Sequence, residues 1–248
     1  MRALLLPIKD LRNSKQRLAG LLTPEERFGL AQAMLTDTVR AVQGVRRADN
    51  IFVVTNYVPA MRFAQENGWE VLREQQQISE SVSVDTASLQ CQGLGISALL
   101  RLPLDLPLLR AADIDEVLEI ECVPPAVVIV PSRDGTGTNA IMRTPPTLFP
   151  SHFGPGSFAK HCAEAHCAGA QVFVRRNARL EMDVDDETDL RALVQHDLSG
   201  TETGMWLEKS GLWRRFDLGT EPGCKCHFLN QSCGASLNDS FPLKSILR

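Results

Sequence analysis

Two glycine-rich loops carry hydroxyl side chains in a pattern that suits the binding of a small anion. Residues 133–139 read RDGTGTN, and residues 153–158 read FGPGSF. Glycine lets the backbone approach a ligand closely, and the backbone N–H groups of such loops act as fixed hydrogen-bond donors. Either loop alone is explained equally well as a surface turn. Because acidic sites accompany both loops, we interpret them as parts of one anion-binding site.

Three aspartates are candidate ligands for Mg²⁺. Asp105 follows residues 96–104, an apolar stretch that we predict to be a strand. A carboxylate there is costly unless it is solvated, paired or bound to a metal. Asp183 and Asp185 lie two residues apart on a segment predicted to be extended, so their side chains point to the same side. Like charges on one side attract a cation, and Mg²⁺ binds carboxylates together with substrate phosphates, so the three aspartates predict a magnesium site.

A basic segment follows the first predicted strand, residues 2–8. It contains Lys9, Lys15 and Arg17. In an open α/β sheet, ligands bind beyond the carboxyl ends of the strands, so these side chains are candidates to hold phosphates. The alternative is a solvated run of charge. The segment lacks the glycine patterns of Walker and dinucleotide-binding loops, which argues against P-loop enzymes and Rossmann dehydrogenases.

Strands and helices alternate along the chain, which predicts a mostly parallel sheet joined by right-handed crossovers. One helix is predicted to begin at Pro24, with Thr23 as its N-cap and Glu26 completing a capping box. Asp186 and Asp189 are predicted to serve the start of the last helix. We predict further strands over residues 50–55, 69–72, 126–131, 140–143 and 171–175, and further helices over residues 59–67, 84–91, 111–121 and 157–168.

The composition limits the class of protein. The chain has 248 residues, 44% of them hydrophobic, which is enough for one sizeable α/β core. A net charge of -4 gives no case for nucleic-acid binding, and no stretch approaches the ~20 apolar residues of a membrane span. The seven scattered cysteines suit a reducing compartment better than a disulfide framework. We therefore expect a cytoplasmic protein that binds neither nucleic acid nor a membrane.

The composition changes near residue 198. Residues 198–248 are rich in Gly, Ser and Asn and lack a sustained hydrophobic period. The cysteines and the histidine within residues 224–233 could in principle bind a metal, but their spacing does not match a zinc finger or ribbon. We therefore predict one domain over residues 1–197 and a flexible tail over residues 198–248.

Five motifs, in this order, resemble the guanylyltransferases of coenzyme F-420 biosynthesis, which belong to the same group as the molybdenum-cofactor guanylyltransferases. The motifs are PIK at residues 7–9 with SKQRL at 14–18, LDLP at 104–107, DGTGTNA at 134–140, FGPGSF at 153–158 with His161, and DVDDETDL at 183–190. They cover about residues 1–195. The resemblance implies a single nucleotidyltransferase-type domain, a MobA-like and Rossmann-like three-layer sandwich around a mostly parallel sheet.

The resemblance also implies a reaction. The phosphate of a small three-carbon phospho-acid attacks the α-phosphorus of GTP, and diphosphate is released. Thr138, Gly154 and Ser157 match the family positions that hold the phospho-acid. The acceptor is 2-phospho-L-lactate, phosphoenolpyruvate or 3-phospho-D-glycerate, and the sequence does not distinguish these three, because each combines a carboxylate with a phosphate.

The remaining site residues are implied in the same way. Pro7, Lys9, Lys15 and Arg17 match the segment that binds the nucleotide. Lys15 and Arg17, together with Asp105, are the candidate catalytic residues. The three aspartates described above match the Mg²⁺ ligands. Nucleotidyl transfer needs charge neutralisation and in-line placement more than covalent chemistry, which agrees with these residue types.

Two other functions stay open at this point. Another MobA-like nucleotidyltransferase predicts a glycine-rich first loop, which this chain lacks. A non-catalytic nucleotide-binding protein predicts loss of the acidic ligands, which this chain keeps. The sequence does not reveal which residues read guanine, whether the chain forms a homodimer, or whether it passes its product directly to the next enzyme of the pathway.

Overall fold

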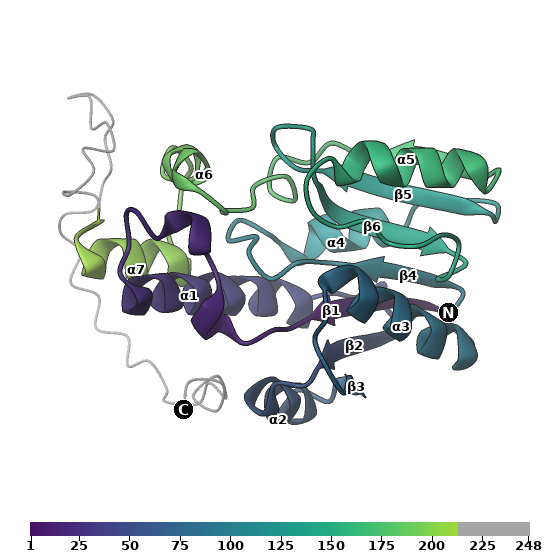
Figure 1. Ribbon diagram of the computed structural model, residues 1–248, viewed down its shortest axis with the longest axis horizontal. Helices are drawn as coiled ribbons and strands as arrows, with labels where there is room; N and C mark the ends of the chain where they lie inside the picture. Colours follow the sequence, from purple (N-terminus) through teal and green to yellow (C-terminus); the bar gives the residue numbers. More distant parts are fainter. Residues whose placement is uncertain (213–248) are drawn as a thin grey trace.

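The computed structural model describes residues 1–212, and its centre is a seven-stranded sheet (Figure 1). From one edge to the other, the strands are β3 (Glu70–Arg73), β2 (Asn50–Thr55), β1 (Arg2–Pro7), β4 (Ala98–Arg101), β6 (Thr138–Thr144), β5 (Ala126–Pro131) and β7 (Gln171–Val174). All neighbours are parallel except that β6 runs antiparallel to β4 and β5. The first residue of β6 therefore lies at the edge where the parallel strands end.

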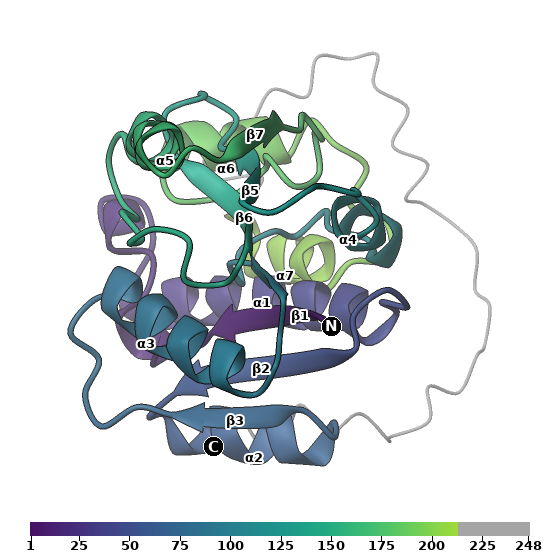
Figure 2. The same cartoon turned by 90° about the vertical axis from the view of Figure 1, so that its right-hand side faces the viewer.

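Helices cover both faces of the sheet and complete three layers (Figures 1 and 2). The helices are α1 (Pro24–Gln43), α2 (Val58–Glu66), α3 (Glu80–Gly93), α4 (Ala111–Leu118), α5 (Ser157–Cys167), α6 (Glu187–Leu193) and α7 (Glu202–Ser210). Helices α1, α2 and α4 pack on one face with Leu4 and Leu6, whereas α3 packs on the other face with Ala3 and Leu5. Helix α5 packs against β5 and β6. The predicted three-layer α/β sandwich with a mostly parallel sheet is confirmed.

The local signals for helix starts are also confirmed. The Thr23 side chain accepts a hydrogen bond from the Glu26 N–H, and the Glu26 carboxylate accepts one from the Thr23 N–H, so both halves of the capping box are present. At the start of α6, the Asp186 carboxylate accepts bonds from the backbone N–H groups of Thr188 and Asp189. These bonds satisfy N–H groups that have no partner within the helix itself.

Several predicted elements have different bounds, and the two largest differences concern one strand and one helix. The strand predicted over residues 96–104 ends at Arg101. The N–H of Leu102 still donates to the carbonyl of Leu5, but Pro103 has no N–H with which to extend the ladder. Asp105 therefore lies on a loop beyond β4. The helix predicted over residues 84–91 begins earlier, at Glu80, because the Ser79 side chain caps it.

The predicted domain boundary at residue 197 is wrong for residues 198–212. Helix α7 packs along α1, and a Cβ atom at Gly29 would lie only 2.4 Å from Nε1 of Trp206. Asp37 of α1 accepts hydrogen bonds from the backbone N–H groups of Glu202 and Thr203 at 2.8 and 2.9 Å. Residues 198–212 thus belong to the domain.

The rest of the predicted tail, residues 213–248, lies outside the described residues, and so does the cysteine cluster at 224–233. Within residues 1–212, no helix combines the length and the apolar character that a membrane span requires.

Candidate active site

One cavity of about 770 Å³ opens at the edge where the parallel strands end. Both glycine-rich loops, the basic segment after β1 and the acidic segments line it. All ten residues predicted to form the site lie in its wall: Pro7, Lys9, Lys15, Arg17, Asp105, Thr138, Gly154, Ser157, Asp183 and Asp185. Segments 170 residues apart in the sequence are thereby brought to one place. The topology accounts for this, because the carboxyl ends of parallel strands share one edge of the sheet.

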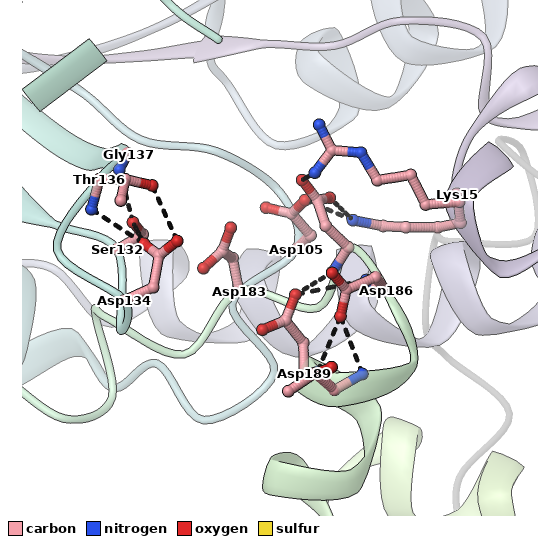
Figure 3. Close-up of polar contacts among 12 residues, drawn as sticks. Lys15, Asp105, Ser132, Asp134, Thr136, Gly137, Asp183, Asp186 and Asp189 are labelled. Carbon is pink, nitrogen blue, oxygen red and sulfur yellow. Dashed lines mark hydrogen bonds and ion pairs between the residues drawn. The ribbon is translucent and has the colours of Figure 1, made fainter. Parts of the chain in front are cut away.

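Asp134 organises the first glycine-rich loop (Figure 3). Its carboxylate accepts hydrogen bonds from the Ser132 hydroxyl at 2.5 Å, the Thr136 N–H at 2.9 Å and the Thr136 hydroxyl at 2.8 Å. These bonds, above all the one from Ser132, lower the pKa of Asp134 to about 2. Gly135 has a φ of 75°, which glycine adopts without strain. The loop is therefore shaped by its own side chains.

The second glycine-rich loop leads into α5. Gly154 and Gly156 have φ values of 117° and 70°, and Ser157 is the first residue of the helix. The Phe158 N–H donates to the carbonyl of Thr136 at 3.1 Å, which joins the two loops. The N-cap position of α5 is occupied by Gly156, which has no side chain with which to cap the helix. The helix dipole and the hydroxyl of Ser157 at this end of the cavity favour an anion.

Lys15 pairs with two of the predicted metal ligands, and Figure 3 shows it beside one of them, Asp105. Its Nζ is 2.5 Å from Oδ2 of Asp105 and 3.0 Å from Oδ1 of Asp185, and Arg17 lies 3.6 Å from Asp185. Burial disfavours the charged ammonium, but attraction to the two carboxylates is stronger in sum and raises the pKa of Lys15. Lys15 therefore stays protonated and holds the basic segment against the acidic one.

The three aspartates line the cavity without forming a ready-made metal site. Within residues 1–212, no group of three or more His, Cys, Asp or Glu side chains is arranged to hold a metal ion. Asp183 has an amide partner, Asn139, at 2.9 Å, and no ion pair in this part of the chain. Burial, reinforced by the charges of Asp105 and Asp185, raises the pKa of Asp183 to about 6. A bound cation would therefore offset the repulsion between Asp183 and the neighbouring carboxylates.

Arg101 is a cavity residue that the sequence analysis missed. It occupies the last position of β4, and the residues around it in the sequence are apolar. A charged side chain in such a run could have indicated a functional residue. Its guanidinium pairs with Glu80, donates to the carbonyl of Asn139 at 2.9 Å and lies 4.2 Å from the centroid of the Phe153 ring. Nε of Arg101 is buried and has no hydrogen-bond partner within residues 1–212. A fixed planar cation thus faces the end of the cavity formed by the second glycine-rich loop.

Two acidic residues predicted to serve the start of α6 have that role. Asp186 caps the helix, and Oδ2 of Asp189 accepts from the N–H of Asp185 at 3.1 Å (Figure 3). Asp189 also pairs with Arg133 of the first glycine-rich loop at 3.0 Å. The segment that carries Asp183 and Asp185 belongs to no helix or strand, and buried residues alternate along it with these two partly buried aspartates.

Comparison with known proteins identifies the family. Residues 1–224 match the family model described as guanylyl transferase CofC like. The chain belongs to this guanylyltransferase family. A phosphoenolpyruvate guanylyltransferase of Rubrobacter xylanophilus is 35% identical over 190 residues, which cover 76% of this chain and 91% of that protein. A 2-phospho-L-lactate guanylyltransferase of Methanothermobacter thermautotrophicus is 29% identical over 205 residues, which cover 83% and 89% of the two chains.

Two solved structures illustrate the shared architecture. One from Desulfovibrio desulfuricans, described as a nucleotide-diphospho-sugar transferase, has a TM-score of 0.69 at 16% identity and covers 87% of this chain and 97% of its own. A nucleotidyl transferase from Methanothermobacter thermautotrophicus has a TM-score of 0.52 at 14% identity, with 84% and 98% covered. At these identities the likeness establishes the fold. The family match makes the protein an enzyme that transfers a guanylyl group.

Proposed function

We propose that this enzyme transfers GMP from GTP to a small phosphorylated three-carbon acid in coenzyme F-420 biosynthesis. A phosphate oxygen of the acceptor attacks the α-phosphorus of GTP, the bond from that phosphorus to the bridging oxygen breaks, and diphosphate leaves. The acceptor phosphate is already largely ionised near neutral pH, so the reaction needs no dedicated general base. The observation that carries the proposal is the single cavity that joins the basic segment, the carboxylates and both glycine-rich loops.

The two ends of the cavity suit different substrates. Its volume of about 770 Å³ is in the range of sites that enclose a ligand of drug size. Pro7, Lys9, Lys15 and Arg17 form the end proposed to bind the triphosphate. This assignment agrees with the chemistry of lysine and arginine, which bind phosphate oxygens as a point charge and as a two-pronged donor.

The opposite end is proposed to hold the acceptor. Thr138 and Ser157 offer hydroxyl groups, and Gly154 allows close approach of the backbone. Arg101, which pairs with Glu80, offers a guanidinium group at this end, where a carboxylate of the acceptor would lie. Phosphoenolpyruvate, 2-phospho-L-lactate and 3-phospho-D-glycerate all fit this description, and the names of the relatives favour the first two.

The charges of the cavity support a requirement for Mg²⁺. Five basic and eight acidic side chains line it, so it repels two polyanionic substrates unless further positive charge is added. The donors available are hard carboxylate oxygens, which Mg²⁺ prefers. Asp105, Asp183 and Asp185 would hold the ion, and Asp183 lacks an ion pair within residues 1–212. When bound, Mg²⁺ would supply positive charge to the phosphate oxygens.

Diphosphate release tests the proposed function. The purified enzyme is incubated with GTP and Mg²⁺, and each of the three phospho-acids is supplied separately. We expect one acceptor to support turnover, with the guanylylated product identified by mass spectrometry, and we expect a chelator to stop the reaction. Reactions with ATP or CTP in place of GTP are the matched controls. If folded protein released no diphosphate with any of the three acceptors, the assignment of the substrates would be refuted.

A further inference from the structure

His161 is a buried polar residue one helical turn after Ser157 in α5. Its imidazole is fully enclosed, and Nδ1 lies 3.0 Å from Oγ1 of Thr138, a residue that lines the cavity. Residues four apart in a helix lie on the same side, so α5 presents Ser157 and His161 toward the same end of the cavity. His161 itself is not part of the cavity wall as described. Any effect on a bound ligand must therefore pass through Thr138.

The second ring nitrogen of His161 fixes where its proton lies. Nε2 is 2.8 Å from the backbone nitrogen of His152, and a backbone N–H can only donate. Nε2 must therefore be the unprotonated, accepting nitrogen. A neutral imidazole then carries its hydrogen on Nδ1, so Nδ1 donates to Oγ1 of Thr138.

The imidazole is held in its neutral form. Burial, together with the positive charge of Arg143 and smaller effects of His152 and Arg101, lowers the pKa of His161 to about 3. The opposing effect of Asp85 is weaker. Across the neutral range the tautomer is therefore decided by the hydrogen bond from the His152 N–H.

The hydroxyl of Thr138 has one hydrogen and, within residues 1–212, His161 as its hydrogen-bond partner. Because it accepts from Nδ1, its own hydrogen is free to point into the cavity. We infer that His161 is a positioning residue that fixes the Thr138 hydroxyl as a hydrogen-bond donor to the acceptor anion. An anion offers only accepting oxygens, so a hydroxyl fixed as a donor binds it without first turning away from another partner. This inference rests on the proposed function for the identity of the anion.

Two amide variants separate the two hydrogen bonds of His161. The amide of His161→Asn can lie near the position of Nδ1 and donate to Thr138, whereas that of His161→Gln reaches toward the position of Nε2 and His152. We expect His161→Gln to raise the KM for the acceptor about tenfold, or about 1.4 kcal/mol, because the Thr138 hydroxyl is then no longer fixed as a donor to the charged acceptor. His161→Asn should stay within about threefold of wild type, and the KM for GTP should not change in either variant.

Thr138→Val tests whether His161 affects the KM for the acceptor through the Thr138 hydroxyl. It should raise the KM for the acceptor about tenfold, and adding His161→Gln to it should cause no further rise, because the hydroxyl that His161 orients is gone. His152→Gln is the matched control, since it changes the neighbouring histidine but keeps the backbone N–H. A double variant whose KM is the product of the two single effects would overturn the inference, and so would a His161→Gln enzyme with the KM of wild type.

A measurement on the unmodified protein keeps the inference testable if a variant fails to fold. Nitrogen-15 NMR of the imidazole side chains reads the tautomer directly. We expect a protonated Nδ1 and an unprotonated Nε2 for His161 at neutral pH, with His161→Asn identifying the signal. The opposite tautomer, or a charged ring, would overturn the inference. If wild type turned over none of the acceptors but showed the expected tautomer, the proposed function would fail while the orientation of Thr138 would stand.

Discussion

Residues 198–212 should be required for a stable enzyme, because they cover one side of α1. Leu198, Leu207 and Leu212 are buried in a cluster with Leu30 and Met34 of α1. Burial of one leucine side chain contributes about 2 kcal/mol, so these three contribute on the order of 6 kcal/mol. The unfolded chain already buries part of this area, which reduces the loss to about 4 kcal/mol or more. A domain of this kind has a free energy of unfolding of about 5–15 kcal/mol, so the loss is a large part of the total.

The perturbation is a chain that ends at residue 197, compared with one that ends at residue 212. The two chains differ only in residues 198–212, which are α7 and the residues on either side of it, and both lack residues 213–248. Urea unfolding followed by circular dichroism measures the free energy of unfolding of both. We expect the shorter chain to be less stable by about 4 kcal/mol or more, or to be unfolded in buffer. Unfolding midpoints that agree for the two chains would refute the assignment of residues 198–212 to the domain.

Three further outcomes follow from the site. Asp105→Asn should lower kcat at least about a hundredfold while the melting temperature stays near that of wild type, because Lys15 keeps its ion pair with Asp185. Arg101→Lys should raise the KM for the acceptor about tenfold, but not the KM for GTP, because lysine cannot reproduce a planar guanidinium stacked on a ring. The pKa of His161 is 6.5 in the unfolded chain and about 3 in the folded protein. Its contribution to the free energy of unfolding is therefore fully present above pH 6.5 and is lost progressively as the pH falls toward 3, because only the unfolded chain binds the proton in that range. Urea unfolding across that window should show a shallower pH dependence for His161→Asn, and equal slopes would contradict this.

The layers of the fold could be predicted because their signals are local. Strand β1 reads as a continuous apolar run, since Leu4 and Leu6 face one layer of helices while Ala3 and Leu5 face the other. The start of α1 is encoded within four residues by a capping box. Local signals of this kind need no knowledge of distant parts of the chain, and both predictions are confirmed.

The end of the domain could not be read in the same way. Helix α7 is short and not strongly apolar, and its buried residues become recognisable only against α1. The contact depends on Gly29, which leaves room for Trp206, and on Asp37, whose carboxylate receives the first N–H groups of the helix. Neither residue signals a partner by itself, because glycine and aspartate have many other uses inside or beside helices. The prediction of a domain boundary at residue 197 rested on composition alone and therefore left residues 198–212 out of the domain.

At the site, the sequence predicts which residues take part, but it does not predict which of them pair with one another. The rule that ligands bind at the carboxyl edge of an open sheet predicts that Lys15, Asp105 and Asp185 lie together, and all three line one cavity. Lys15, which makes ion pairs with both aspartates, has a left-handed backbone with a φ of 53°, a conformation that lysine rarely adopts. Such a conformation costs about 1–3 kcal/mol and persists only where the surroundings impose it. The ion pairs supply that constraint, and since they form only in the folded chain, no pattern in the sequence could have revealed them.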